Sequence, residues 1–73
     1  MKCHIITWDR NTGYDDKLDY NTLPQAKDAA VVYLKDHEEV YIVTDHTLVC
    51  VFDEKNPKGR KPYNFEVLKF RFK

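Results

Sequence analysis

Serine is absent from this 73-residue chain, which also has only two glycines and two cysteines. Mechanisms that use a serine nucleophile are therefore excluded, and two glycines are too few for a dinucleotide fingerprint or a phosphate-binding loop. Two cysteines do not make a disulfide framework. The N-terminal apolar stretch is too short for a signal peptide, and no apolar run approaches the ~20 residues of a membrane helix. We expect one domain spanning residues 1–73, cytoplasmic, with reduced thiols and no membrane contact.

The chain as a whole has no formal net charge, because twelve basic residues balance twelve acidic ones, but the two signs are unevenly distributed along it. Residues 1–54 hold five basic and eleven acidic side chains, a net charge of −6. Residues 55–73 hold seven basic side chains and one acidic one, a net charge of +6. Such asymmetry bears on partners more than on fold. The basic segment either contacts the acidic part of its own domain or binds something else.

The first twenty residues predict a β-hairpin. Residues 2–9 are rich in strand formers, and the turn signal that follows ends at Gly13, which can adopt positive φ. Residues 14–20 alternate with the period of a strand. The alternation places Tyr14, Asp16, Leu18 and Tyr20 on one face and Asp15, Lys17 and Asp19 on the other.

A helix is predicted next, from the capping-box sequence at residues 22–25 to about Asp36. The Thr22 hydroxyl would accept from the Gln25 amide, and Pro24 fits the first turn. Helical spacing puts an apolar face toward the sheet and leaves Val31 and Val32 beside the outer face. The acidic cluster after the helix, Asp36, Glu38 and Glu39, is either a solvated corner or a docking site for a cationic group.

Residues 40–53 predict a second hairpin, with a tight turn near Asp45 and His46. Residues 54–62 contain two prolines and a glycine and predict a loop, and a last strand is expected from Tyr63 to Phe72. The fold class is therefore α+β: a small antiparallel or mixed sheet of about five strands, in the order β-β-α-β-β-β, with one helix packed on one face. The last strand could pair with either hairpin.

The middle hairpin is apolar on both faces, whereas one helix of this length covers part of one face. Either the sheet curls strongly enough to bury both sets of side chains, or its second face meets another copy or another protein. We favour a homodimer or a partner-binding face. The apolar residues predicted to contact the partner are Val31, Val32, Tyr41, Val43, Val49 and Val51.

Potential metal ligands and catalytic groups lack the spacing that their chemistry requires. Cys3, His4, His37, His46 and Cys50 show no paired-ligand motif, so we expect no metal and no other cofactor. Acidic residues adjacent to the histidines do not form dyads, because neighbours on a strand point to opposite faces. We expect no catalytic residue and no enzymatic activity.

The basic segment suggests contact with an anion or a nucleic acid. On the predicted last strand, Lys69, Arg71 and Lys73 would form a row about 6.5–7 Å apart, with Tyr63 and Phe65 beside it as stacking surfaces. A lysine row on an edge strand also prevents edge-to-edge aggregation. The residues predicted for anion or nucleic-acid contact are Lys55, Lys58, Arg60, Lys61, Lys69, Arg71 and Lys73.

Three hypotheses follow. The first is a small non-catalytic protein-binding or inhibitor-type module that acts as a homo-oligomer. In style it resembles the accessory proteins of phages and mobile elements, being compact, acid-rich and free of motifs. The second is a nucleic-acid-binding module that uses residues 55–73. The third is a binder of flat small ligands, with Trp8, Tyr14 or Tyr41 stacking in a pocket between subunits.

Overall fold

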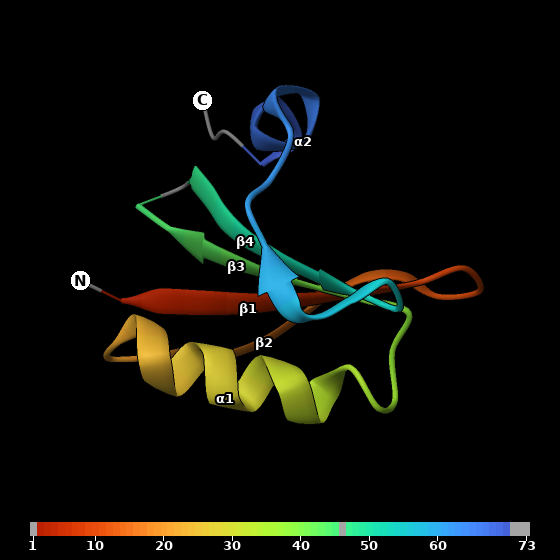
Figure 1. The fold of residues 1–73 in the computed structure, drawn as a ribbon, viewed down its shortest axis with the longest axis horizontal. Helices are drawn as coiled ribbons and strands as arrows, with labels where there is room; N and C mark the ends of the chain where they lie inside the picture. Colours follow the sequence, from red (N-terminus) through yellow and green to blue (C-terminus); the bar gives the residue numbers. More distant parts are fainter. Residues whose placement is uncertain (1, 46, 71–73) are drawn as a thin grey trace.

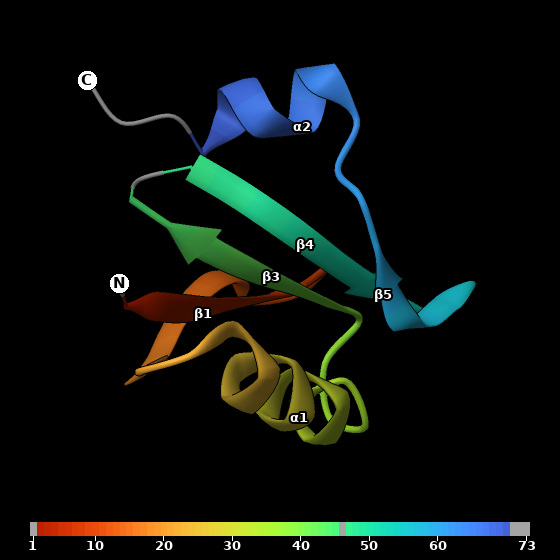
Figure 2. The same cartoon turned by 60° about the vertical axis from the view of Figure 1, so that its left-hand side comes forward.

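A computed structural model describes residues 2–45 and 47–70 and shows a five-stranded sheet with helices on opposite sides (Figures 1 and 2). The elements are β1 (Cys3–Asp9), β2 (Gly13–Tyr20), α1 (Leu23–Tyr33), β3 (Glu39–Thr44), β4 (Thr47–Asp53), β5 (Asn56–Arg60) and α2 (Asn64–Lys69). The strand order is β2-β1-β3-β4-β5, and every neighbouring pair is antiparallel. Among the described residues, no helix has the length and apolar character needed to cross a membrane.

The α+β class, both predicted hairpins and the long helix are confirmed. β1 pairs with β2 across the turn that ends at Gly13, whose φ is 76°. α1 begins after Thr22, whose hydroxyl accepts a hydrogen bond from the Gln25 amide at 3.3 Å. That bond satisfies one of the free amides of the first turn, so the local sequence alone specifies where the helix starts.

The C-terminal third differs from the prediction. Residues 56–60, expected in a loop, form β5, which pairs with β4 at the edge of the sheet. An edge position tolerates Pro57, and Gly59 at φ 94° lets the backbone approach the side chains of Cys50 and Phe52. The strand expected over residues 63–72 is wrong where the structure describes it, because Asn64–Lys69 is helical.

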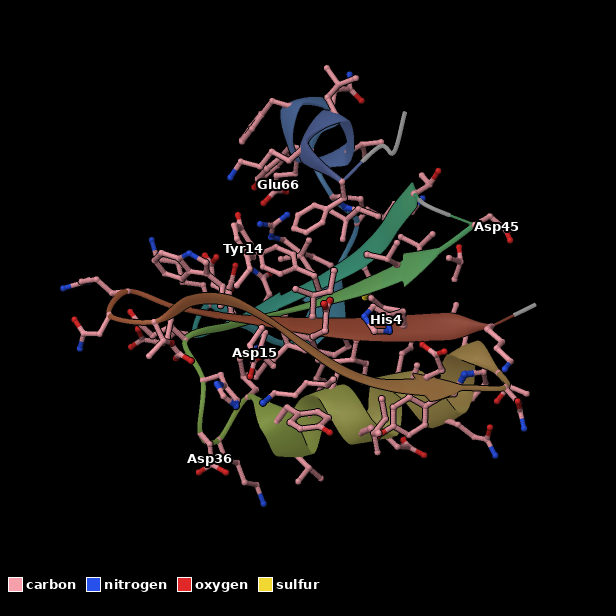
Figure 3. The ribbon with its side chains drawn as sticks, turned by 180° about the vertical axis from the view of Figure 1, so that it is seen from behind. His4, Tyr14, Asp15, Asp36, Asp45 and Glu66 are labelled. Atoms are coloured by element: carbon pink, nitrogen blue, oxygen red, sulfur yellow. The ribbon has the colours of Figure 1, made fainter. Side chains whose placement is uncertain are left out.

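A β-bulge in β2 changes which residues share a face. His4 lies opposite Asp19, but Ile6 lies opposite Asp16, so three steps along β2 match two steps along β1. The extra residue reverses the alternation beyond it. Asp19 therefore joins Tyr14 and Asp16 on the α2 side, and Tyr20 packs on the α1 side, contrary to the predicted grouping. Figure 3 shows Tyr14 and Asp15 on opposite sides of the sheet.

Each face of the sheet carries its own apolar core. On the first face, Ala26 and Ala30 of α1 pack against a buried cluster that includes Cys3, Ile5, Val40, Ile42, Cys50 and Phe52. On the second face, a cluster of Ile6, Tyr41, Val43, Leu48 and Val51 is packed by Trp8 and by Phe70, directly after α2. The one-helix prediction is therefore wrong: a second helix lies over part of the face that we expected a partner to cover.

Candidate protein-binding surface on α2

The apolar residues predicted to contact a partner do not form one surface. Tyr41, Val43 and Val51 lie in the second-face core and are at most 5% exposed. Val49 is half-buried against the first-face cluster. Val31 and Val32 lie on α1 and are 43% and 60% exposed. In this fold Val31 and Val32 are the exposed members of the predicted set, and Val49 is partly accessible.

The predicted basic residues are also dispersed. Lys55 follows β4, Lys58 and Arg60 belong to β5, Lys61 follows it, and Lys69 ends α2. Because Lys69 is helical, the expected row along a strand is not formed at this position, and Arg71 and Lys73 lie outside the described residues. Lys58, Arg60 and Lys61 share one surface hollow with Leu23 and Lys27.

Arg60 anchors α2 to the sheet through ion pairs. Its guanidinium donates to both carboxylate oxygens of Glu66, at 2.7 and 2.9 Å, and its Nε lies 3.5 Å from Asp53. Glu66 also accepts from the Tyr63 amide at 2.9 Å, which is the reach-back half of a capping box. We call Asp53, Arg60 and Glu66 the α2 anchor. All three side chains are at most 21% exposed, so the pairs are shielded from water.

The pKa shifts within the α2 anchor agree with this geometry. The hydrogen bond from Arg60 lowers the pKa of Glu66 below its ordinary value and outweighs the opposing effect of burial. The same bond raises the pKa of Arg60. Both groups are therefore charged at neutral pH, and the bidentate geometry fixes the orientation of α2.

Phe70 provides the apolar part of the attachment. Its ring meets Tyr41 at a centroid distance of 4.9 Å and Tyr14 edge-on at 5.6 Å. A flat ligand would therefore have to displace Phe70 to stack on the part of Tyr41 that Phe70 contacts, whereas Tyr14 stays 51% exposed. Trp8 instead lines a shallow groove of about 650 Å³, together with Arg10, Leu34 and His37. Trp8 lies opposite Tyr14 in the β1–β2 pairing and Tyr14 lies 6.0 Å from Tyr41, so the three residues of the small-ligand hypothesis are neighbours, with Phe70 packed on the two tyrosines.

The opposite side of α2 is apolar and exposed. Tyr63, Phe65 and Leu68 are 57%, 64% and 65% exposed, and we call these three residues the α2 platform. The rings of Tyr63 and Phe65 stack at 5.7 Å with an interplanar angle of 16°. The Arg60 guanidinium lies over the Tyr63 ring, 4.5 Å from its centroid. Because Arg60 is itself held by Glu66, the platform is built on a fixed base.

Two buried groups, the Cys50 thiol and the Tyr41 hydroxyl, ionise less readily than their exposed counterparts. Burial raises the pKa of the Cys50 thiol, which opposes formation of a nucleophilic thiolate. Burial, together with a hydrogen bond that the Tyr41 hydroxyl donates to Glu39, raises the pKa of Tyr41. Within residues 2–45 and 47–70, no group of three or more His, Cys, Asp or Glu side chains is arranged to hold a metal ion.

A charged cluster that the sequence did not reveal joins β1 to β2. His4 Nδ1 lies 2.6 Å from Asp19 Oδ1, and His4 Nε2 lies 3.0 Å from Asp16 Oδ1. We call His4, Asp16 and Asp19 the His4 bracket. Burial lowers the pKa of His4, but the hydrogen bonds to the two carboxylates outweigh it and leave the pKa raised. The bulge brings Asp16 and Asp19 to one face, and nothing in the alternation of residues 14–20 marks a bulge.

The acidic corner after α1 is occupied by internal bonds. His37 Nδ1 lies 2.6 Å from Asp9 Oδ2, and the Glu38 amide donates to Asp9 Oδ1 at 2.9 Å. The Glu38 carboxylate in turn accepts from the Arg10 amide at 2.7 Å. These contacts tie the segment after α1 to the end of β1 and engage the Glu38 carboxylate, while Asp36 is exposed.

Comparisons with known proteins find no protein similar to this chain. A scan against protein-family models finds no match to the chain, and searches of curated proteins and of solved structures find none either.

Proposed function

We propose that this chain is a non-catalytic protein-binding module of the inhibitor type, and that the α2 platform is its contact surface. The observation that carries the proposal is the outward display of Tyr63, Phe65 and Leu68 by a helix whose inner side is fixed by ion pairs. Large apolar side chains held rigidly at the surface lose little conformational entropy on binding and are typical of interface hot spots.

The platform favours a protein over a nucleic acid. The ring of Tyr63 already stacks on Phe65 and lies under the Arg60 guanidinium, so a base would have to compete with these contacts to stack on it. Leu68 adds an aliphatic surface, which suits an apolar pocket better than a base stack. The charges of Lys61 and Lys69, next to the platform in sequence, suit a partner with acidic residues around that pocket.

Self-association is part of the proposal, because a second copy carries the acidic residues that such a partner needs. Sedimentation velocity of the purified protein over a range of concentrations tests this directly. The double variant Phe65→Ala/Leu68→Ala should shift the distribution toward monomer, whereas Val31→Ala/Val32→Ala, which removes exposed apolar side chains from α1, should not. A wild-type chain that stays monomeric at the highest concentration removes the homo-oligomer from the proposal.

Capture from the native host, with and without nuclease, tests a different protein partner. A partner retained after nuclease by the wild type and the α1 variant, but lost by the α2 variant, supports the platform as the contact surface. Loss of every partner on nuclease treatment would instead favour the nucleic-acid hypothesis. A cytoplasmic setting remains part of the proposal and accords with the two buried free thiols, Cys3 and Cys50.

A further inference from the structure

The His4 bracket joins the edge strand β2 to the central strands by side chains. β2 is the first strand of the sheet order and pairs with β1, and both ring nitrogens of His4 on β1 meet carboxylates of β2. The two carboxylates lie on either side of the bulge. A bulge interrupts the backbone ladder, so the side-chain bonds add to the attachment of the strand where its backbone bonding is irregular.

The number of protons on the imidazole determines how many of these bonds form. An ionised carboxylate only accepts hydrogen bonds, so each ring nitrogen must donate to satisfy its partner. The imidazolium has two N–H groups, whereas neutral imidazole has one. Deprotonation of His4 therefore removes one of the two bonds and leaves a nitrogen lone pair facing a carboxylate.

The surroundings of His4 are mainly acidic and apolar. It lines a groove of about 500 Å³ on the second face of the sheet, and the charged residues there are Lys2, Asp16, Asp19 and Asp45. Ile6 and Val43 complete the lining. Asp45, which directly follows β3, adds a third carboxylate to this lining, and Lys2 is the basic residue among these groove residues. Figure 3 shows His4 and Asp45 toward the same end of the sheet.

We propose that the His4 bracket is a proton-operated clamp that holds the bulged edge strand β2 when His4 is charged and loosens it when His4 loses its proton. An edge strand presents unpaired backbone groups and is the part of a sheet that most readily pairs with another chain. The clamp thus makes the accessibility of this edge depend on pH within the range in which histidine titrates. The inference is independent of the α2 platform, which lies on a different element.

Amide hydrogen exchange by NMR, with each rate corrected for its intrinsic pH dependence, measures the opening of β2. Between about pH 5 and about pH 8, the opening constant of β2 amides should rise two- to fivefold relative to β3 amides, as expected for a partly exposed ion pair. His4→Gln should abolish this pH dependence, and Asp16→Asn and Asp19→Asn should each weaken it. His37→Gln, which removes the histidine–carboxylate contact between His37 and Asp9, should leave the β2 response intact.

The ¹⁵N shifts of the His4 ring provide a second measurement that does not depend on strand stability. Two protonated nitrogens at pH values where a free histidine is neutral are expected from the bracket. The proposal is overturned if the β2 opening constant does not change with pH in the wild type, or if His4→Gln retains the wild-type response. Because Asp16 and Asp19 are 81% and 52% exposed, their asparagine variants should fold even if His4→Gln does not.

Discussion

Removal of the Glu66 carboxylate should detach α2 while leaving the sheet folded. Loss of one partner of a buried ion pair costs about 3–5 kcal/mol, because the remaining charge is left without compensation. Here the Glu66 and Arg60 side chains are 12% and 18% exposed. Asp53 stays near Arg60 in the variant, so the positive charge of Arg60 is still partly neutralised. We therefore expect Glu66→Ala to lower the free energy of unfolding by about 2–3 kcal/mol.

Glu66→Gln removes the negative charge of the side chain but keeps its size, so it distinguishes the ion pair from the packing. The amide oxygen of glutamine still accepts from the Tyr63 amide, as Glu66 does at 2.9 Å, but the bidentate ion pair with Arg60 is lost. The expected loss is about 1–2 kcal/mol. Because the folded pKa of Glu66 is lowered, its stabilisation is present above the ordinary glutamate pKa and disappears as pH falls through the folded pKa. Glu66→Gln should remove this acid-dependent part.

Urea denaturation followed by circular dichroism gives the free energies, and hydrogen-exchange mass spectrometry locates the change. Exchange should accelerate in the segment from Lys61 to Phe70 and in the apolar strands β3 and β4 beneath it, with little effect in α1. Glu54→Ala, which removes an exposed carboxylate in the β4–β5 turn, is the matched control and should stay within about 0.5 kcal/mol of wild type. A Glu66→Ala loss no larger than that of the control would refute the assignment of the α2 anchor.

Two further predictions concern turns and the start of α1. Gly59→Ala should lower the free energy of unfolding, measured in urea, by about 2–3 kcal/mol, because φ is 94° and the new Cβ would lie 2.9 Å from Cys50 Sγ. Gly13 also has positive φ but open space around it, so Gly13→Ala should lower the free energy of unfolding by only about 1 kcal/mol. Equal losses in the two glycine variants would contradict the steric argument. Thr22→Ala should lower the free energy of unfolding by about 1 kcal/mol, because the Thr22 hydroxyl accepts a hydrogen bond from the Gln25 amide, and Thr22→Asp should keep the wild-type value. An unchanged melting temperature in Thr22→Ala would oppose the capping role.

The elements with strong local signals were predictable from the sequence. Thr22 and Pro24 mark the start of α1, and Gly13 marks the first hairpin, because capping and turn chemistry act over a few residues. Paired apolar runs likewise identified β3 and β4. These are the features in which local preference and the final fold agree.

The C-terminal region was not predictable in the same way, because long-range contacts determine it. Residues 63–70 fit both a strand alternation and a helical spacing, and the choice between them involves Arg60, which lies before the segment, and Tyr14 and Tyr41, which lie far away in the chain. The prolines and glycine of residues 54–62 predicted a loop, but an edge strand tolerates them. The sequence therefore placed the candidate partner-binding site mainly on the middle hairpin, whereas the exposed apolar residues of the structure point to α2.

The position of α2 has a further consequence for shortened forms of this chain. All strands of the described sheet and α1 precede α2, so a chain truncated after Arg60 keeps every one of these strands but lacks Glu66 and Phe70. In such a chain the side chains of Tyr41 and Val51 lose part of their cover, and exposed apolar surface promotes aggregation. We therefore expect the truncated chain to aggregate at concentrations at which the chain with α2 stays dispersed.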